Sequence, residues 1–236
     1  MTTAETIILS IRKMLVPVRP EGYPFIAILA VVALFFGWYW QPILWVGLIL
    51  AAWCAYFFRD PARVTPQDDA LVISPADGRI VEVSLGVAPK ELAMGEQTRR
   101  RVSIAISLFD CHVNRSPVTG RVIRVAYTPG KRGNMDIDRT NPGKERNGFV
   151  IETSNGLVGV VQIAGLVARR IVSFRREGDP LAQGERIGMI RFGSQVDLYL
   201  PVAAGIVVAE GQTAIAGETV IARFGGGNGD RRVRID

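Results

Sequence analysis

Residues 102–108 read Val-Ser-Ile-Ala-Ile-Ser-Leu, and this stretch decides the fold class. Apolar and small polar residues alternate along it, which is typical of a strand with one buried face. Similar short runs rich in β-branched residues and bounded by glycine lie on both sides of it. They are residues 78–83, 120–127, 148–153 and 156–163. The chain from Ala70 onward is therefore predicted to be mainly β, with a barrel-like or sandwich-like architecture.

The carboxy-terminal part of this β region has a pattern of its own. Gly211 and Gly217 lie at turn spacing between short apolar runs in residues 205–222, which resembles the sandwich of biotinyl and lipoyl carrier domains. A carrier needs an exposed lysine at its hairpin tip, and residues 193–224 contain no lysine. The pattern favours a related sandwich and disfavours a carrier function.

The amino-terminal part is apolar instead. No Asp, Glu, Lys, Arg or His occurs from Gly22 to Phe58. Within this run, Pro24 to Trp40 and Pro42 to Phe58 are two apolar stretches of 17 residues, joined through Gln41. A helix of that length is about 25 Å long, just short of the roughly 30 Å hydrocarbon core of a bilayer. We therefore expect a helical hairpin at about residues 24–58, either spanning the membrane or re-entrant. A cleaved signal peptide and a buried hairpin of a soluble protein are the alternatives.

These patterns divide the chain into three parts: residues 1–62 with the hairpin, a β-rich domain at 63–224, and a flexible basic tail at 225–236. Cationic residues flank the hairpin on both sides. They are Arg12, Lys13 and Arg19 before it, and Arg59 and Arg63 after it. The positive-inside rule then places both flanks on the cytoplasmic face of the cell (inner) membrane.

The net charge of +6 and the pI of about 9.7 suit an anionic partner, which beside an apolar segment is the acidic surface of a bilayer. A nucleic-acid partner is not predicted, because Lys and Arg are scattered and no aromatic residues interleave with a basic stripe. One histidine and two cysteines cannot assemble a typical zinc site, so no metal is expected. Cys54 lies inside the apolar run and Cys111 far outside it, which favours a reducing compartment over a disulfide.

The candidate chemistry centres on the single histidine, His112, which directly follows the alternating strand. Histidine is the side chain whose ordinary pKa suits acid–base work near neutral pH, although a structural histidine in a turn is an alternative. The neighbouring Cys111 would point to the opposite face of an extended segment, so a packing role is favoured for it. Asp77-Gly78 is a common turn pair, and Gly193-Ser194 lacks the second glycine of a hydrolase nucleophile elbow.

Four motifs in one order carry a resemblance. They are Phe57-Phe58-Arg59-Asp60-Pro61, Pro75-Ala76-Asp77-Gly78, His112-Val113-Asn114-Arg115-Ser116-Pro117, and Gly193-Ser194 followed by Val196-Asp197-Leu198-Tyr199-Leu200-Pro201. Together they closely resemble the short form of the phosphatidylserine decarboxylase family, found in archaea and proteobacteria. Gln195 departs from the Thr that follows the Gly-Ser pair in long members, which bears on the rate of processing.

The resemblance implies a membrane-associated pyruvoyl enzyme that converts phosphatidylserine to phosphatidylethanolamine and CO2 through a Schiff base. The implied processing triad is Asp77, His112 and Ser194. The Ser194 hydroxyl attacks the carbonyl of Gly193 to give an ester, and elimination followed by hydrolysis leaves a covalent pyruvoyl group at position 194 with release of ammonia. The mature protein would then pair a large β chain, 1–193, with a small α chain, 194–236.

The lipid phosphate calls for cationic or hydroxyl groups, and Arg115, Ser116, Lys131 and Arg132 are the candidates. The pattern leaves the substrate backbone open between diacylglycerol and archaeal ether lipid. Two other functions are alternatives: a pyruvoyl decarboxylase of a soluble amino acid, and a membrane-tethered β-sandwich adaptor without chemistry. The apolar hairpin argues against the first, because a water-soluble substrate needs no anchor.

Overall fold

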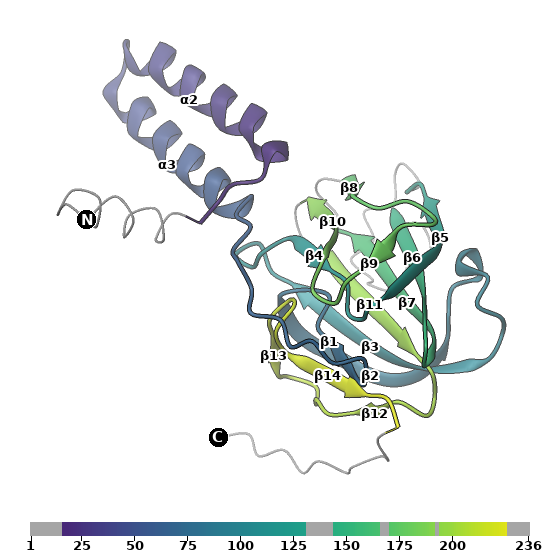
Figure 1. The fold of residues 1–236 in the computed structure, drawn as a ribbon. Coiled ribbons are helices and arrows are strands. Elements are labelled where there is room, and N and C mark those ends of the chain that lie inside the picture. Colours follow the sequence, from purple (N-terminus) through teal and green to yellow (C-terminus); the bar gives the residue numbers. More distant parts are fainter. Residues whose placement is uncertain (1–15, 131–143, 166–169, 192–193, 226–236) are drawn as a thin grey trace, which may run out of the picture. The chain divides into compact units, whose positions relative to one another are not determined.

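A computed structural model describes residues 16–130, 144–165, 170–191 and 194–225 (Figure 1). The chain divides into two compact units, Met1–Ala62 and Arg63–Asp236. The first unit is helical and the second is built from strands. Gly193, Lys131, Arg132 and the tail from residue 226 onward lie outside the described residues.

The helical unit is the predicted hairpin. A short 3-10 helix, η1 (Pro20–Gly22), leads into α2 (Tyr23–Gly37), and α3 (Gln41–Phe57) follows after a short connection. Each long helix has a proline in its first turn, where the missing N–H costs no helical hydrogen bond. Pro42 therefore lies in the first turn of a second helix, which the sequence predicts.

Small residues let the two helices pack closely. A Cβ atom on Gly47 would lie 2.3 Å from the Cβ of Ala33, so only glycine fits at this crossing. Ala33, Ala51 and Cys54 are buried within the unit. At the open end of the hairpin, the rings of Phe25 and Phe58 stack with their centroids 5.6 Å apart.

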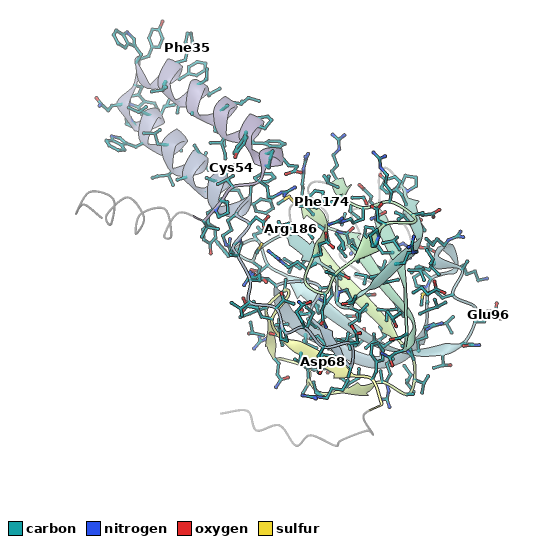
Figure 2. The ribbon with its side chains drawn as sticks, viewed as in Figure 1. Phe35, Cys54, Asp68, Glu96, Phe174 and Arg186 are labelled. Atoms are coloured by element: carbon teal, nitrogen blue, oxygen red, sulfur yellow. The ribbon has the colours of Figure 1, made fainter. Side chains whose placement is uncertain are left out.

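The remaining surface of the hairpin is apolar and exposed. Phe35 projects outward from α2 (Figure 2) and is 62% exposed. Other large apolar side chains share this exposure: Val31, Leu34, Trp38, Tyr39, Trp40, Trp45 and Ile49. By length and composition, the segment Pro20–Gly37 is long and apolar enough to cross a membrane, and Gln41–Phe57 is a shorter apolar helix.

The second unit is mainly β, as predicted. Its strands are β1 (Leu71–Ile73), β2 (Gly78–Val87), β3 (Thr98–Ile106), β4 (Val113–Arg115), β5 (Gly120–Thr128), β6 (Arg146–Thr153), β7 (Gly156–Ala164), β8 (Arg170–Ser173), β9 (Pro180–Leu181), β10 (Arg186–Arg191), β11 (Ser194–Leu200), β12 (Gly205–Ile206), β13 (Thr213–Ala214) and β14 (Val220–Arg223), with a 3-10 turn, η2 (Lys90–Leu92). All five strand runs predicted from the sequence lie in or across these strands. The alternation of residues 102–108 overruns β3 by two residues.

Three sheets make up this unit. An eight-stranded antiparallel sheet, in the order β13-β2-β3-β11-β7-β6-β5-β9, curls into a half-barrel (Figure 1). Two three-stranded sheets, β4-β10-β8 and β1-β14-β12, complete the domain. The predicted glycine-punctuated segment forms β12 to β14, with Gly211 and Gly217 at positive φ.

The eight-stranded sheet buries residues on both faces. The core face carries the main apolar cluster, to which Ile104, Val160 and Val196 belong. The second face carries a smaller cluster with Val161 and Tyr199. Because successive residues of a strand point to opposite faces, the position of any residue along β3, β7 or β11 decides which cluster it joins.

Candidate active site

Four strand ends meet at one edge of the half-barrel (Figure 1). Ser194 begins β11 and pairs with Ile106 at the end of β3 and with Ala164 at the end of β7. The next strand, β2, begins at the same edge, because Arg79 pairs with Ala105. Asp77, which precedes β2, therefore lies at the same edge as Ser194.

His112 reaches this edge through the turn that follows β3. Its main-chain carbonyl accepts a hydrogen bond from the Ile190 amide at 3.2 Å, three residues before Gly193. The side chain is fully buried, and Nδ1 lies 3.0 Å from the Asp110 carbonyl oxygen. A carbonyl oxygen can only accept, so Nδ1 carries the hydrogen and Nε2 is the basic nitrogen of the neutral ring.

Asp110 holds both the turn and the histidine. Its carboxylate accepts a hydrogen bond from the Ser107 amide at 2.7 Å, and its carbonyl oxygen is the acceptor for His112. This cap ends β3 at Ile106, although the sequence alternation continues to Leu108. The turn that follows β3 therefore places the Asp110 carbonyl oxygen, and this oxygen sets the ring orientation of His112.

Asp77 is held by partners on both carboxylate oxygens. Arg63 Nη2 donates to Oδ2 at 2.6 Å, and the Ala216 amide donates to Oδ1 at 2.7 Å. The exposed side-chain fractions of Arg63 and Asp77 are only 12% and 13%, so the ion pair is largely buried. Among the hydrogen bonds of the described residues, no direct Asp77 to His112 bond of a Ser-His-Asp triad occurs. Asp77 instead anchors the start of β2 to the linker residue Arg63 and to the loop before β14.

Three buried amides form a chain on the core face near this edge. Asn147 Nδ2 donates to Gln162 Oε1 at 3.0 Å, and Gln162 Nε2 donates to Asn114 Oδ1 at 2.8 Å. Each of the three residues is at most 2% exposed. Within the described part of the chain, Asn114 Nδ2 is buried without a hydrogen-bond partner. A buried donor left unpaired costs about 1–3 kcal/mol, so an oxygen acceptor is expected there.

A separate network fixes Gln195 on the second face. Gln195 Nε2 donates to Asp197 Oδ1 at 2.6 Å, and Arg101 Nη2 donates to Asp197 Oδ2 at 2.8 Å. Burial and the Asp197 carboxylate raise the pKa of Tyr199 to about 12, so this phenol stays neutral at physiological pH. The residue after Ser194 is thus held by a charged network away from the core face.

A family model for phosphatidylserine decarboxylase matches residues 50–222, which is most of the chain. The chain belongs to the phosphatidylserine decarboxylase family. This membership confirms the resemblance drawn from the four motifs. Enzymes of the phosphatidylserine decarboxylase family are carboxy-lyases that use a pyruvoyl group, and their chemistry supports decarboxylation of phosphatidylserine as the activity.

The match to the decarboxylase family covers the whole edge described above. It begins within α3 and ends in β14, so it includes Asp77, His112 and Ser194, while α2 lies before it. The side chain of Ser194 and the whole of Gly193 are not among the described features. Their roles in cleavage remain predictions.

Two of the four phosphate candidates can be placed, and both are buried. Arg115 Nη1 donates to the Gly184 carbonyl oxygen at 3.1 Å, and Ser116 Oγ donates to the Val118 carbonyl oxygen at 2.6 Å. These contacts hold the chain after β4. In this chain they favour a structural role over phosphate binding, and Lys131 and Arg132 lie outside the described residues.

Sequence reasoning assigned no role in the site to Asp110, Asn114 or Arg63. Asp110 stands two residues before the only histidine, and that spacing is the one signal that points to it. Asn114 lies inside the motif that runs from His112 to Pro117, but its partner Gln162 is 48 residues away. Arg63 is one of the cations predicted to flank the hairpin, and the structure pairs it with Asp77.

Proposed function

We propose that this protein is a membrane-associated phosphatidylserine decarboxylase that cuts itself between Gly193 and Ser194. The observation that carries the proposal is the meeting of Asp77, His112 and the start of β11 at one sheet edge. His112 is a buried base whose Nε2 is the basic nitrogen, and Ser194 is the residue that needs deprotonation. The heterodimer of chains 1–193 and 194–236 follows from this cleavage.

The residues at this edge fit a covalent pyruvoyl group derived from Ser194. Position 194 is the first residue of β11, so cleavage before it opens the connection from β10 and leaves the β11 ladder intact. The unpartnered Nδ2 of Asn114 offers a donor for a ligand oxygen on the core face. The pyruvoyl carbonyl supplies an electrophile for the substrate amine and takes up the electrons released with CO2. In this proposal His112 gives or takes the proton.

A lipid substrate is supported by apolar surface beside His112. Leu108 and Phe109 lie at the tip of the turn after β3, and their exposed fractions are 45% and 65%. Hydrogen bonds from the Ser107 and Phe109 amides to Asp110 and Ser107 side chains fix the turn. A fixed turn that exposes two large apolar side chains next to the site suits acyl chains and the lipid surface better than a water-soluble amino acid.

The cleavage is tested on the mature protein by intact mass measurement. We expect two chains, of which the smaller is residues 194–236 (43 residues) with an amino terminus blocked to Edman degradation, because a pyruvoyl group has no free amine. A tethered adaptor without chemistry gives one chain. Full-length protein that decarboxylates the lipid while uncut would contradict the proposed source of the carbonyl.

The hairpin is the proposed anchor, and its deletion should release the protein. Removing residues 1–60 takes away the exposed apolar surface of α2 and α3, so the remaining unit is expected in the soluble fraction after a high-salt wash. Flotation with vesicles measures this. Deleting only residues 1–15, which leaves both helices, is the matched control and should keep the protein bound. Retention of the 1–60 deletion would show that another surface anchors the protein, and the Leu108 and Phe109 tip is then the first to test.

A further inference from the structure

The amide chain ends beside the reacting edge. Asn114 pairs with Gly188 on β10, and Gln162 lies on β7 two residues before Ala164, the partner of Ser194. Two residues of strand correspond to about 7 Å. A Cβ on Gly188 would lie 2.8 Å from Gln162 Nε2, so the missing side chain of Gly188 makes room for the Gln162 amide. The chain of amides therefore joins the strand after His112 to the strand beside β11.

The direction of the hydrogen bonds decides which atom of the Asn114 side-chain amide is left for a ligand. Gln162 Nε2 donates to Asn114 Oδ1, so the Nδ2 group of Asn114 is the donor that is left for a further partner. His112 and Asn114 are two residues apart and both fully buried, and Ile190 extends the β4 ladder to the His112 carbonyl. Residues at this spacing share one face of an extended segment. The donor thus lies on the same side as the candidate base.

We propose that Asn114 binds the carboxylate of the serine headgroup, which is the group that leaves as CO2. This inference rests on the proposed function and names one contact of its substrate. A neutral amide donor can orient a carboxylate without the strong charge stabilisation that a guanidinium would give. Loss of CO2 removes the negative charge from that position, so weak solvation of the carboxylate favours the reaction. Gln162 and Asn147 are positioning residues, because their hydrogen bonds keep the Asn114 side chain oriented with Nδ2 toward the substrate.

Two substitutions remove the donor by different routes. Asn114→Asp keeps the shape but replaces the donor with an anion that repels the carboxylate. Gln162→Glu offers an acceptor to Asn114 and thereby turns its Nδ2 away from the substrate. Both should raise KM for phosphatidylserine by about 10- to 100-fold, the range for one hydrogen bond to a charged group. Asn155→Asp, at the exposed turn between β6 and β7, is the matched control and should behave as the wild type.

Paired ligands separate carboxylate recognition from a general loss of the site. Phosphatidylserine and phosphatidylethanolamine differ only in the carboxylate, and both carry the amine that borohydride can link to the fragment 194–236. The two variants should lose trapping of the serine lipid and keep trapping of the ethanolamine lipid. Equal loss with both lipids, or unchanged KM in Asn114→Asp, would overturn the assignment.

Self-cleavage of each variant is scored first on a denaturing gel. If both variants are folded by circular dichroism but stay uncut, the donor serves cleavage and the substrate assignment is wrong. If the wild type itself neither cuts nor decarboxylates, the proposed function fails, and this outcome is distinct from failure of the Asn114 contact. Tighter binding of the serine lipid by Asn114→Asp would show that the site needs an acceptor, which also contradicts the proposal.

Discussion

Ser194→Ala should leave the chain as a single uncut polypeptide without decarboxylase activity. The substitution removes the hydroxyl that attacks the Gly193 carbonyl, and an alanine cannot yield a pyruvoyl group. The expected loss of activity is complete within detection, because no other source of the carbonyl exists in this proposal. A denaturing gel and release of CO2 from the lipid measure the two effects. Ser154→Ala, in the exposed turn between β6 and β7, is the control and should be cut and active.

His112→Ala is expected to slow the cut by about 100- to 10,000-fold, the usual contribution of a positioned general base. The substitution also leaves a cavity in a fully buried position, so thermal unfolding must be followed in parallel. A folded variant that stays uncut supports the base role. Normal processing in a folded His112 variant would remove this residue from the mechanism.

The location of Asp77 could be predicted from the sequence, but its contacts could not. The Pro-x-Asp-Gly motif correctly predicted a turn before a strand, and the register then places this turn at the same edge as Ser194. A triad predicts that Asp77 contacts His112 directly, but the described contacts are those with Arg63 and Ala216. No local pattern predicts a salt bridge to a residue 14 positions away or a bond to an amide 139 positions away. Such contacts depend on the assembled fold.

The strands and the hairpin were predictable for a physical reason. Alternation in residues 102–108 and the absence of charge from Gly22 to Phe58 are local consequences of burial, so they are visible without knowledge of the fold. The amide chain is different, because Asn114, Gln162 and Asn147 lie on three strands and meet only in the folded domain. A buried amide also has no sequence signature that separates it from an exposed one.

The processed protein should convert phosphatidylserine to phosphatidylethanolamine and CO2 without added pyridoxal phosphate or metal. In the proposed mechanism the amine of the lipid reacts at position 194, so borohydride added during turnover should link the lipid to the fragment 194–236. Mass measurement of the separated chains identifies the labelled one. Exposed apolar side chains occur on the proposed anchor and, separately, at Leu108 and Phe109, and such surface favours a lipid substrate in this proposal.

Free serine is expected to be a much poorer substrate, because it lacks the acyl chains and phosphate whose binding positions the headgroup. Truncation of such remote binding groups lowers the rate of the chemical step as well as the affinity, so kcat/KM should fall by several orders of magnitude, on the order of 1,000-fold or more. Soluble serine that reacts as well as the lipid would overturn the substrate assignment. Lipid trapped on chain 1–193 would place the reactive carbonyl away from residue 194, and the meeting of β2, β3, β7 and β11 at that edge would then need another explanation.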